Sequence, residues 1–76
     1  MGRAMRSEPL RDAEQEIEDW NNQNGPGSEV TLTDDFGVEH RTRTRSVAWL
    51  VGGRPLVLVE GRTGGYDLRR IRAGWY

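Results

Sequence analysis

The stretch with the clearest chemical pattern is residues 40–46 (HRTRTRS), where arginine alternates with threonine and serine. In an extended strand, side chains two residues apart share a face, so Arg41, Arg43 and Arg45 would form a ladder with steps of about 7 Å. Parallel guanidinium groups repel one another, which favours an external anion such as the phosphates of a nucleic acid. The alternative is a solvated face whose charges are neutralised by acidic residues of the same chain.

More candidate binding residues lie near the C-terminus. Arg69, Arg70 and Arg72 would extend the basic surface if the last strand lies beside the second. Trp75 and Tyr76 could stack on a nucleic-acid base or anchor a protein partner, because exposed aromatic residues favour contact surfaces. We therefore treat these eight residues, five here and three in the ladder, as the candidate contact surface for a protein or a nucleic acid.

Residues for catalysis or metal binding are sparse. The chain has no cysteine and one histidine, His40, which cannot build a metal site alone. Asp34 and Asp35 are adjacent in a predicted turn, where carboxylates more often hold backbone N–H groups than act as an acid and base pair. The glycine-rich segments lack the lysine of a phosphate-binding loop. We expect a non-enzymatic protein without catalytic residues, metal ligands or cofactors.

The first element that must position these residues is a helix. Ser7 is a suitable N-cap, and Leu10, Ala13, Ile17 and Trp20 recur at helical spacing. The outer face is acidic and the apolar stripe is narrow, so we expect the helix to persist only when it docks, with Trp20 as the anchor. Residues 21–28 (NNQNGPGS) should end the helix and form a linker or long loop.

The period of the apolar pattern changes to two after residue 28. In the first expected strand, Val30 and Leu32 share one face and Thr31 the other. Trp49 is expected in the core, and a Gly-Gly hairpin follows it. The all-apolar Leu56–Val59 predicts a central strand buried on both faces. The expected strands are 29–33, 39–51, 56–60 and 66–71.

Charge and hydropathy divide the chain near residue 29. Residues 1–29 carry three Arg and seven acids, whereas residues 30–76 carry eight Arg, five acids and most of the apolar side chains. We therefore expect one small α+β, mainly β domain, in which 1–28 are helix and linker and 29–76 form the β part with an aromatic end. No run approaches the ~20 apolar residues of a membrane span, and the N-terminus lacks the apolar core of a secretory signal, which together indicate a cytoplasmic protein.

Two resemblances follow from these patterns. Residues 29–72 have the strand order of an SH3-like small β-barrel, which implies four or five antiparallel strands that close around one core. Residues 33–37 (TDDFG), 43–46 (RTRS) and 59–66 (VEGRTGGY) are similar to short proteins of actinobacteria and their phages that have no agreed function. The second resemblance suggests a phage-encoded modulator of a host protein complex and gives no residue a role.

Three functions remain open at this point. The first is a protein-binding module, which we favour because the net charge is −1 and the helix is acidic. The second is a nucleic-acid-binding module that uses the arginine ladder. The third is a structural or assembly subunit whose helix completes its burial against a neighbour. The sequence leaves the partner and the oligomeric state open.

Overall fold

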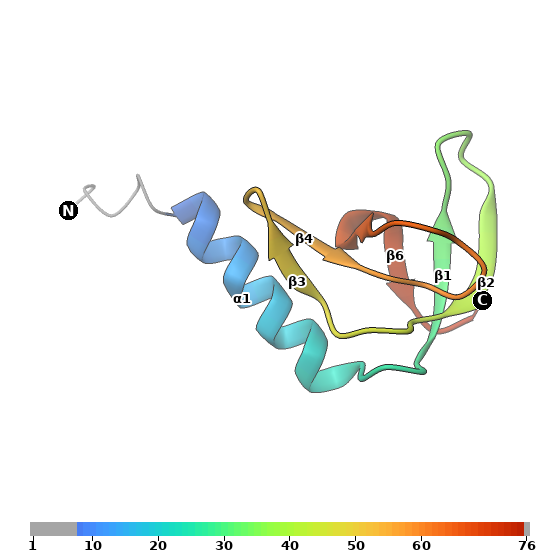
Figure 1. Cartoon of the computed structure of the whole chain (residues 1–76), viewed down its shortest axis with the longest axis horizontal. Helices are drawn as coiled ribbons and strands as arrows, with labels where there is room; N and C mark the ends of the chain where they lie inside the picture. Colours follow the sequence, from blue (N-terminus) through green and yellow to red (C-terminus); the bar gives the residue numbers. More distant parts are fainter. Residues whose placement is uncertain (1–7, 76) are drawn as a thin grey trace.

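The structure, a computed structural model, describes residues 8–75 and begins with helix α1 (Glu8–Gln23) (Figure 1). Ala13 is buried, and Ile17 and Trp20 pack against the core of the strands. The helix and its docking face are therefore confirmed. The expected N-cap Ser7 and the side chain of Leu10 lie outside the described residues.

Near the end of α1, one side chain forms two hydrogen bonds with the β part. Asn21 donates from Nδ2 to the Ala48 carbonyl oxygen (3.0 Å), and its Oδ1 accepts from the Ala48 N–H (2.8 Å). The Asn21 amide thus pairs with both backbone polar groups of Ala48, as a neighbouring strand would. The helix continues to Gln23, inside the predicted linker, and residues 24–28 carry the chain into the first strand.

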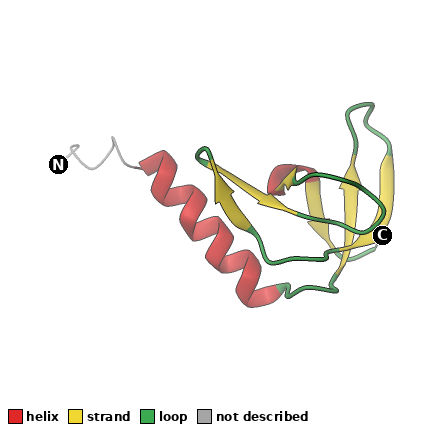
Figure 2. Ribbon diagram, in the orientation of Figure 1, coloured by secondary structure: helices red, strands yellow, loops and turns green. Residues whose placement is uncertain are grey.

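Six strands form two antiparallel three-stranded sheets (Figure 2). The sheet orders are β2-β1-β6 and β3-β4-β5. The mainly β class is confirmed, whereas the prediction of four or five strands in a closed barrel is wrong for residues 8–75. The strands are β1 (Glu29–Thr33), β2 (Glu39–Arg43), β3 (Trp49–Val51), β4 (Arg54–Val57), β5 (Tyr66–Asp67) and β6 (Ile71–Ala73).

The long strand predicted over residues 39–51 is in fact two strands in different sheets. Beyond β2, Thr44 forms an isolated antiparallel bridge with Val59. The Ser46 hydroxyl then accepts the Leu58 N–H (3.1 Å) and donates to the Val47 carbonyl (2.8 Å). A side chain that replaces a backbone partner interrupts the ladder, so the chain bends before β3 begins.

The β3–β4 hairpin agrees with the prediction. Gly52 and Gly53 have φ values of 57° and 82°, the left-handed conformation that a type I′ turn requires at both central positions. Strand β4 is central in its sheet, as predicted. It is not buried on both faces, however, because Val57 is fully buried while Leu56 is only half-buried.

The last strand predicted over residues 66–71 is also divided. Strand β5 pairs with β4, the 3₁₀ turn η2 (Leu68–Arg70) follows, and β6 pairs with β1 in the other sheet. The Asp67 carboxylate accepts the Arg69 N–H (2.9 Å) and caps the turn. The local hydrogen bond competes with strand continuation and returns the chain to the first sheet.

The core lies between the two sheets and is covered by α1 (Figure 1). Thr31, predicted on the outer face, is nonetheless 3% exposed, because its hydroxyl donates to the Gly74 carbonyl (2.8 Å) where the C-terminal segment crosses that face. Among the described residues, no helix combines the length and apolar character needed to cross a bilayer. The buried residues of the core cluster are Val30, Leu32, Ala48, Val57, Val59, Leu68 and Ile71.

Candidate functional site

The three arginines of the predicted ladder do not form one row. Arg41 and Arg43 lie in β2, but Arg45 follows the end of the strand. Its Nε donates to the Val59 carbonyl (2.9 Å) and its Nη2 to the Arg62 carbonyl (3.0 Å). The Arg45 side chain is thus held by two hydrogen bonds to the segment after β4.

Arg43 and Trp75 contact each other on the outer face of the first sheet. The Arg43 guanidinium lies 4.9 Å from the centroid of the Trp75 ring and 3.4 Å from the Glu29 carboxylate. Trp75 Nε1 donates to the Thr42 carbonyl (3.0 Å), and the residue is 39% exposed. Trp75 therefore covers part of its own sheet, while Tyr76 lies outside the described residues.

The other arginines of this face are also engaged within the chain. Arg41 and Arg72 lie on either side of Thr31 in the register of the sheet. Arg72 pairs with Glu39 (3.3 Å), and Arg41 has interactions of its own. The outer face of β2-β1-β6 thus resembles the expected alternative, a solvated face whose arginines pair with acidic residues of the same chain, here Glu29 and Glu39.

The β1–β2 turn is organised by Asp34. Its Oδ1 accepts the Phe36 N–H (2.8 Å) and the Val38 N–H (2.9 Å), and its Oδ2 lies 2.8 Å from His40 Nε2. The hydrogen bond with His40, followed by that from Val38, lowers the pKa of Asp34 to about 2. The structural role predicted for this carboxylate agrees with the geometry, and no metal-ligating cluster of three or more groups occurs in the described chain.

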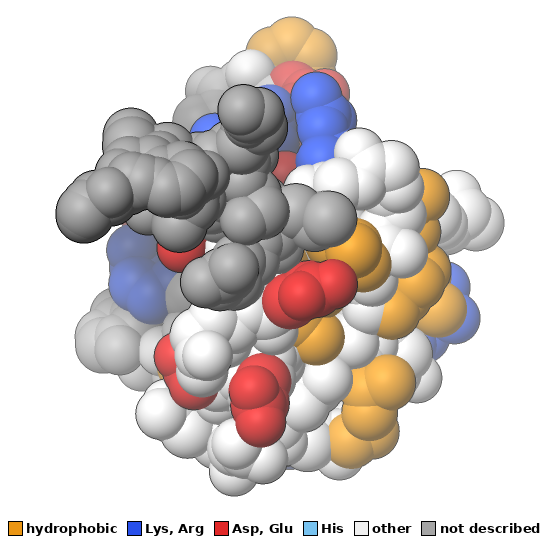
Figure 3. All heavy atoms as spheres, turned by 90° about the vertical axis from the view of Figure 1, so that its left-hand side faces the viewer, with side chains coloured by type: hydrophobic (Ala, Val, Ile, Leu, Met, Phe, Trp, Pro, Cys, Tyr) orange, Lys and Arg blue, Asp and Glu red, His pale blue; other side chains and the backbone are white. Residues whose placement is uncertain are grey.

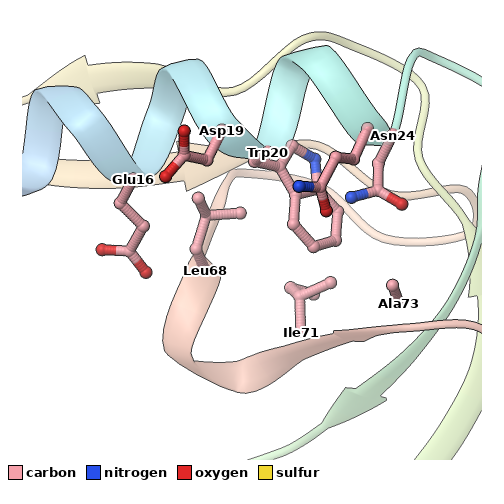
Figure 4. Close-up of a pocket in the computed structure, with 8 residues that line it drawn as sticks. Glu16, Asp19, Trp20, Asn24, Leu68, Ile71 and Ala73 are labelled. Carbon is pink, nitrogen blue, oxygen red and sulfur yellow. The ribbon is translucent and has the colours of Figure 1, made fainter.

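A cleft of about 300 Å³ lies between α1 and the C-terminal segment (Figure 4). Trp20 extends from the helix towards Ile71, with Leu68 beside it, while Glu16 and Asp19 lie at the helix side of the rim. Because Trp20 and Ile71 belong to the core packing, we interpret the cleft as the groove left where the helix docks. Trp20 Nε1 is buried there without a hydrogen-bond partner in the described part of the chain.

Strand β3, on the outer face of β3-β4-β5, and the segment just before it carry an exposed apolar strip, which we define as Val47, Trp49 and Val51. These residues are 50%, 37% and 44% exposed. The prediction that Trp49 lies in the core is wrong: it lies opposite half-buried Leu56 on the outer face. Gly65 makes this possible, because a Cβ there would lie 3.2 Å from Leu56 Cβ and 3.5 Å from Trp49 Cη2.

Hydrophobic side chains gather along one side of the molecular face shown in Figure 3, with exposed acidic side chains next to them. The exposed acids of α1 include Asp12, Glu14 and Glu18. Since α1 contacts β3 and β4, this charge lies on the β3 side of the second sheet. The apolar strip is therefore bordered by negative charge on one side.

A second cleft, of about 370 Å³, borders the same sheet and is lined by Arg54, Asp67, Arg69 and Arg70. We call it the basic cleft. Arg69 is 79% exposed with its Nε 3.6 Å from Asp67, and Arg70 pairs with Asp35 at 3.0 Å. Two of the arginines predicted to bind a partner, Arg69 and Arg70, thus come together with Arg54, which the sequence did not single out.

The sequence of the apolar strip is recognisably apolar, but the predicted strand over residues 39–51 included it in one longer element. Residues 47–51 (VAWLV) are apolar throughout, which predicts the apolar end of a strand with Trp49 in the core. Only the position of β3 at a sheet edge, with α1 on one face, leaves the alternate residues exposed. The contribution of Arg54 follows from the hairpin register, which places it directly opposite Val51.

Comparison of the chain with protein-family models, curated proteins and solved structures finds no match. Any function inferred for the candidate surfaces therefore rests on their geometry and charge alone.

Proposed function

We propose that this domain is a non-enzymatic protein-binding module whose contact surface is the apolar strip. The observation that carries the proposal is the exposure of Val47, Trp49 and Val51 along β3 and the segment just before it. In the described chain, they are three of six exposed large apolar residues. Contiguous apolar side chains, with a tryptophan among them, are typical of protein contact surfaces.

The path of the chain supports an SH3-like fold as the framework of this module. Strands β1 and β2 lie in one sheet, the chain then crosses to β3, β4 and β5, and η2 leads back to β6 beside β1. We propose that this is an SH3-like barrel left open between its sheets, with α1 as an added layer over the core. A fold of this kind hosts many functions, so the partner must be argued from the surface.

The charged surfaces favour a protein over a nucleic acid. Arg43, Arg45 and Arg72 make ion pairs or hydrogen bonds within the chain, so an anion would have to displace those contacts. The net charge of −1 gives no long-range attraction for a polyanion. We also propose a role as a phage-encoded modulator of a host complex, on the resemblance of residues 33–37, 43–46 and 59–66 to short phage proteins.

The test is capture of a protein from an actinobacterial lysate treated with nuclease. We expect wild type to retain a specific protein and the Trp49→Thr, Val51→Thr double variant to lose it. Phe36→Ser is the matched control, because Phe36 is 89% exposed in the β1–β2 turn of the other sheet. Loss with Phe36→Ser but not with the double variant would reject the strip, and loss on nuclease treatment would favour a nucleic-acid role.

A further inference from the structure

The apolar strip and the basic cleft share one face of the second sheet. Residues directly opposite in an antiparallel pair point to the same face, which places Val51 beside Arg54 and aligns Trp49, Leu56 and Asp67 in one row. Asp67 and Arg54 line the cleft. The row therefore runs from an apolar edge at β3 to a polar cleft at β5.

The basic cleft carries more positive charge than its neighbours neutralise. Arg70 is held by Asp35 at 3.0 Å and also lies 3.5 Å from the Thr33 carbonyl, so its position is fixed by the chain. Arg69 is paired with Asp67 only at 3.6 Å while largely exposed, a geometry that contributes little. The Arg54 guanidinium has no ion pair within residues 8–75.

We infer that the partner is a protein segment in which a carboxylate adjoins large apolar side chains, with the apolar groups on the strip and the carboxylate in the basic cleft. The inference rests on the proposed function and names the chemistry of its partner. Guanidinium groups bind carboxylates through paired N–H donors, and Arg54 and Arg69 are the two that can turn towards a ligand. The acids of α1, on the β3 side, would repel an acidic segment there and so favour one orientation.

The combination of an uncharged apolar strip with the basic cleft disfavours a phosphate backbone as the ligand. A nucleic-acid strand would need cationic contacts along its length, whereas the strip beside the cleft is uncharged. A single carboxylate within an apolar segment satisfies both halves at once. Nucleic acid therefore becomes an outcome of the test.

The experiment is selection of a library of short random peptides on the intact chain, followed by titration of the best synthetic peptide. We expect selected sequences in which Asp or Glu adjoins Leu, Ile, Phe or Trp. Binding should weaken as salt rises above about 50 mM, because exposed charge pairs are screened. Mixed-sequence single-stranded and duplex DNA are titrated under the same conditions.

Three variants separate the parts of the surface. In Arg54→Gln with Arg69→Gln, the peptide should bind about 3- to 10-fold more weakly and with less salt dependence. In Trp49→Thr with Val51→Thr, selection should fail. Arg41→Gln, which removes one arginine charge from the other sheet, should bind as wild type does.

Each unfavourable result has a distinct meaning. Apolar peptides without acidic residues, or binding unchanged in the Arg54, Arg69 variant, would overturn this inference and leave the proposed function intact. Failure to select any peptide would overturn this inference, whereas selection that survives loss of the strip would overturn both. Tighter binding of DNA than of peptide, weakened by the arginine variants, would assign the cleft to phosphates.

Discussion

At the scale of single residues, several polar side chains replace backbone partners. Asn21 pairs with both polar groups of Ala48, Asp34 organises a turn, and Ser46 accepts a strand N–H. From the sequence, Asp34 could be predicted in this role because it precedes a Phe-Gly turn. Asn21 and Ser46 could not, because their partners are 27 and 12 residues away in the chain.

The Asp34 carboxylate should make stability depend on pH below pH 4. Its pKa is lowered from 3.8 to about 2 in the folded state, mainly by His40, so between these values the unfolded chain binds more protons. The contribution of the ionised Asp34 carboxylate to the free energy of unfolding is complete above pH 4, and it is lost as pH falls through about 2. Urea unfolding at a series of acidic pH values should show a shallower pH dependence for Asp34→Asn than for wild type. Equal pH dependence of stability in the two proteins would mean that the hydrogen bond with His40 does not couple folding to the protonation of Asp34.

Asn21→Ala should destabilise the domain by about 1–3 kcal/mol, because it leaves the part-buried N–H and carbonyl of Ala48 without their side-chain partner. Asn22→Ala is the control, since Asn22 is exposed in the same helical turn. Denaturant unfolding of both variants measures the difference. Equal stability of the two would show that water replaces the Asn21 amide at no cost.

At the scale of elements, local patterns predicted α1, β1 and the Gly-Gly hairpin. Each depends on residues close in sequence, such as the helical spacing of Ala13, Ile17 and Trp20. The two divided strands could not be predicted, because continuous apolar or alternating residues give no sign of a change of sheet. Side-chain hydrogen bonds from Ser46 and Asp67 mark those changes.

The packing of α1 predicts that the β part is not stable alone. Burying side chains such as Ile17 and Trp20 contributes about 1.5–3 kcal/mol each when complete, and the Asn21 contacts add about 1–3 kcal/mol. A domain of this size has roughly 3–5 kcal/mol in total. A chain lacking residues 1–24 should therefore be largely unfolded by circular dichroism. A cooperative β-type melt would instead show that α1 is an accessory, as the concentration of apolar residues after residue 29 suggests.

At the scale of the whole molecule, the two sheets present different outer faces. The face of β2-β1-β6 is covered by internal ion pairs and by Trp75. The face of β3-β4-β5 combines exposed apolar side chains with a basic cleft. The sequence predicted Arg69 and Arg70 as contact residues, but it could not reveal that Arg54 and Trp49 share their face, because that depends on strand register.

We propose that partners bind the outer face of β3-β4-β5. The most direct measurement is a map of backbone amide chemical shifts by nuclear magnetic resonance during titration with the selected acidic, apolar peptide. We predict that the largest changes fall in residues 47–51, at Arg54 and in residues 65–69, with little change in residues 39–43. Changes concentrated in β2 and near Trp75, or along the helix cleft at Trp20, would contradict the account.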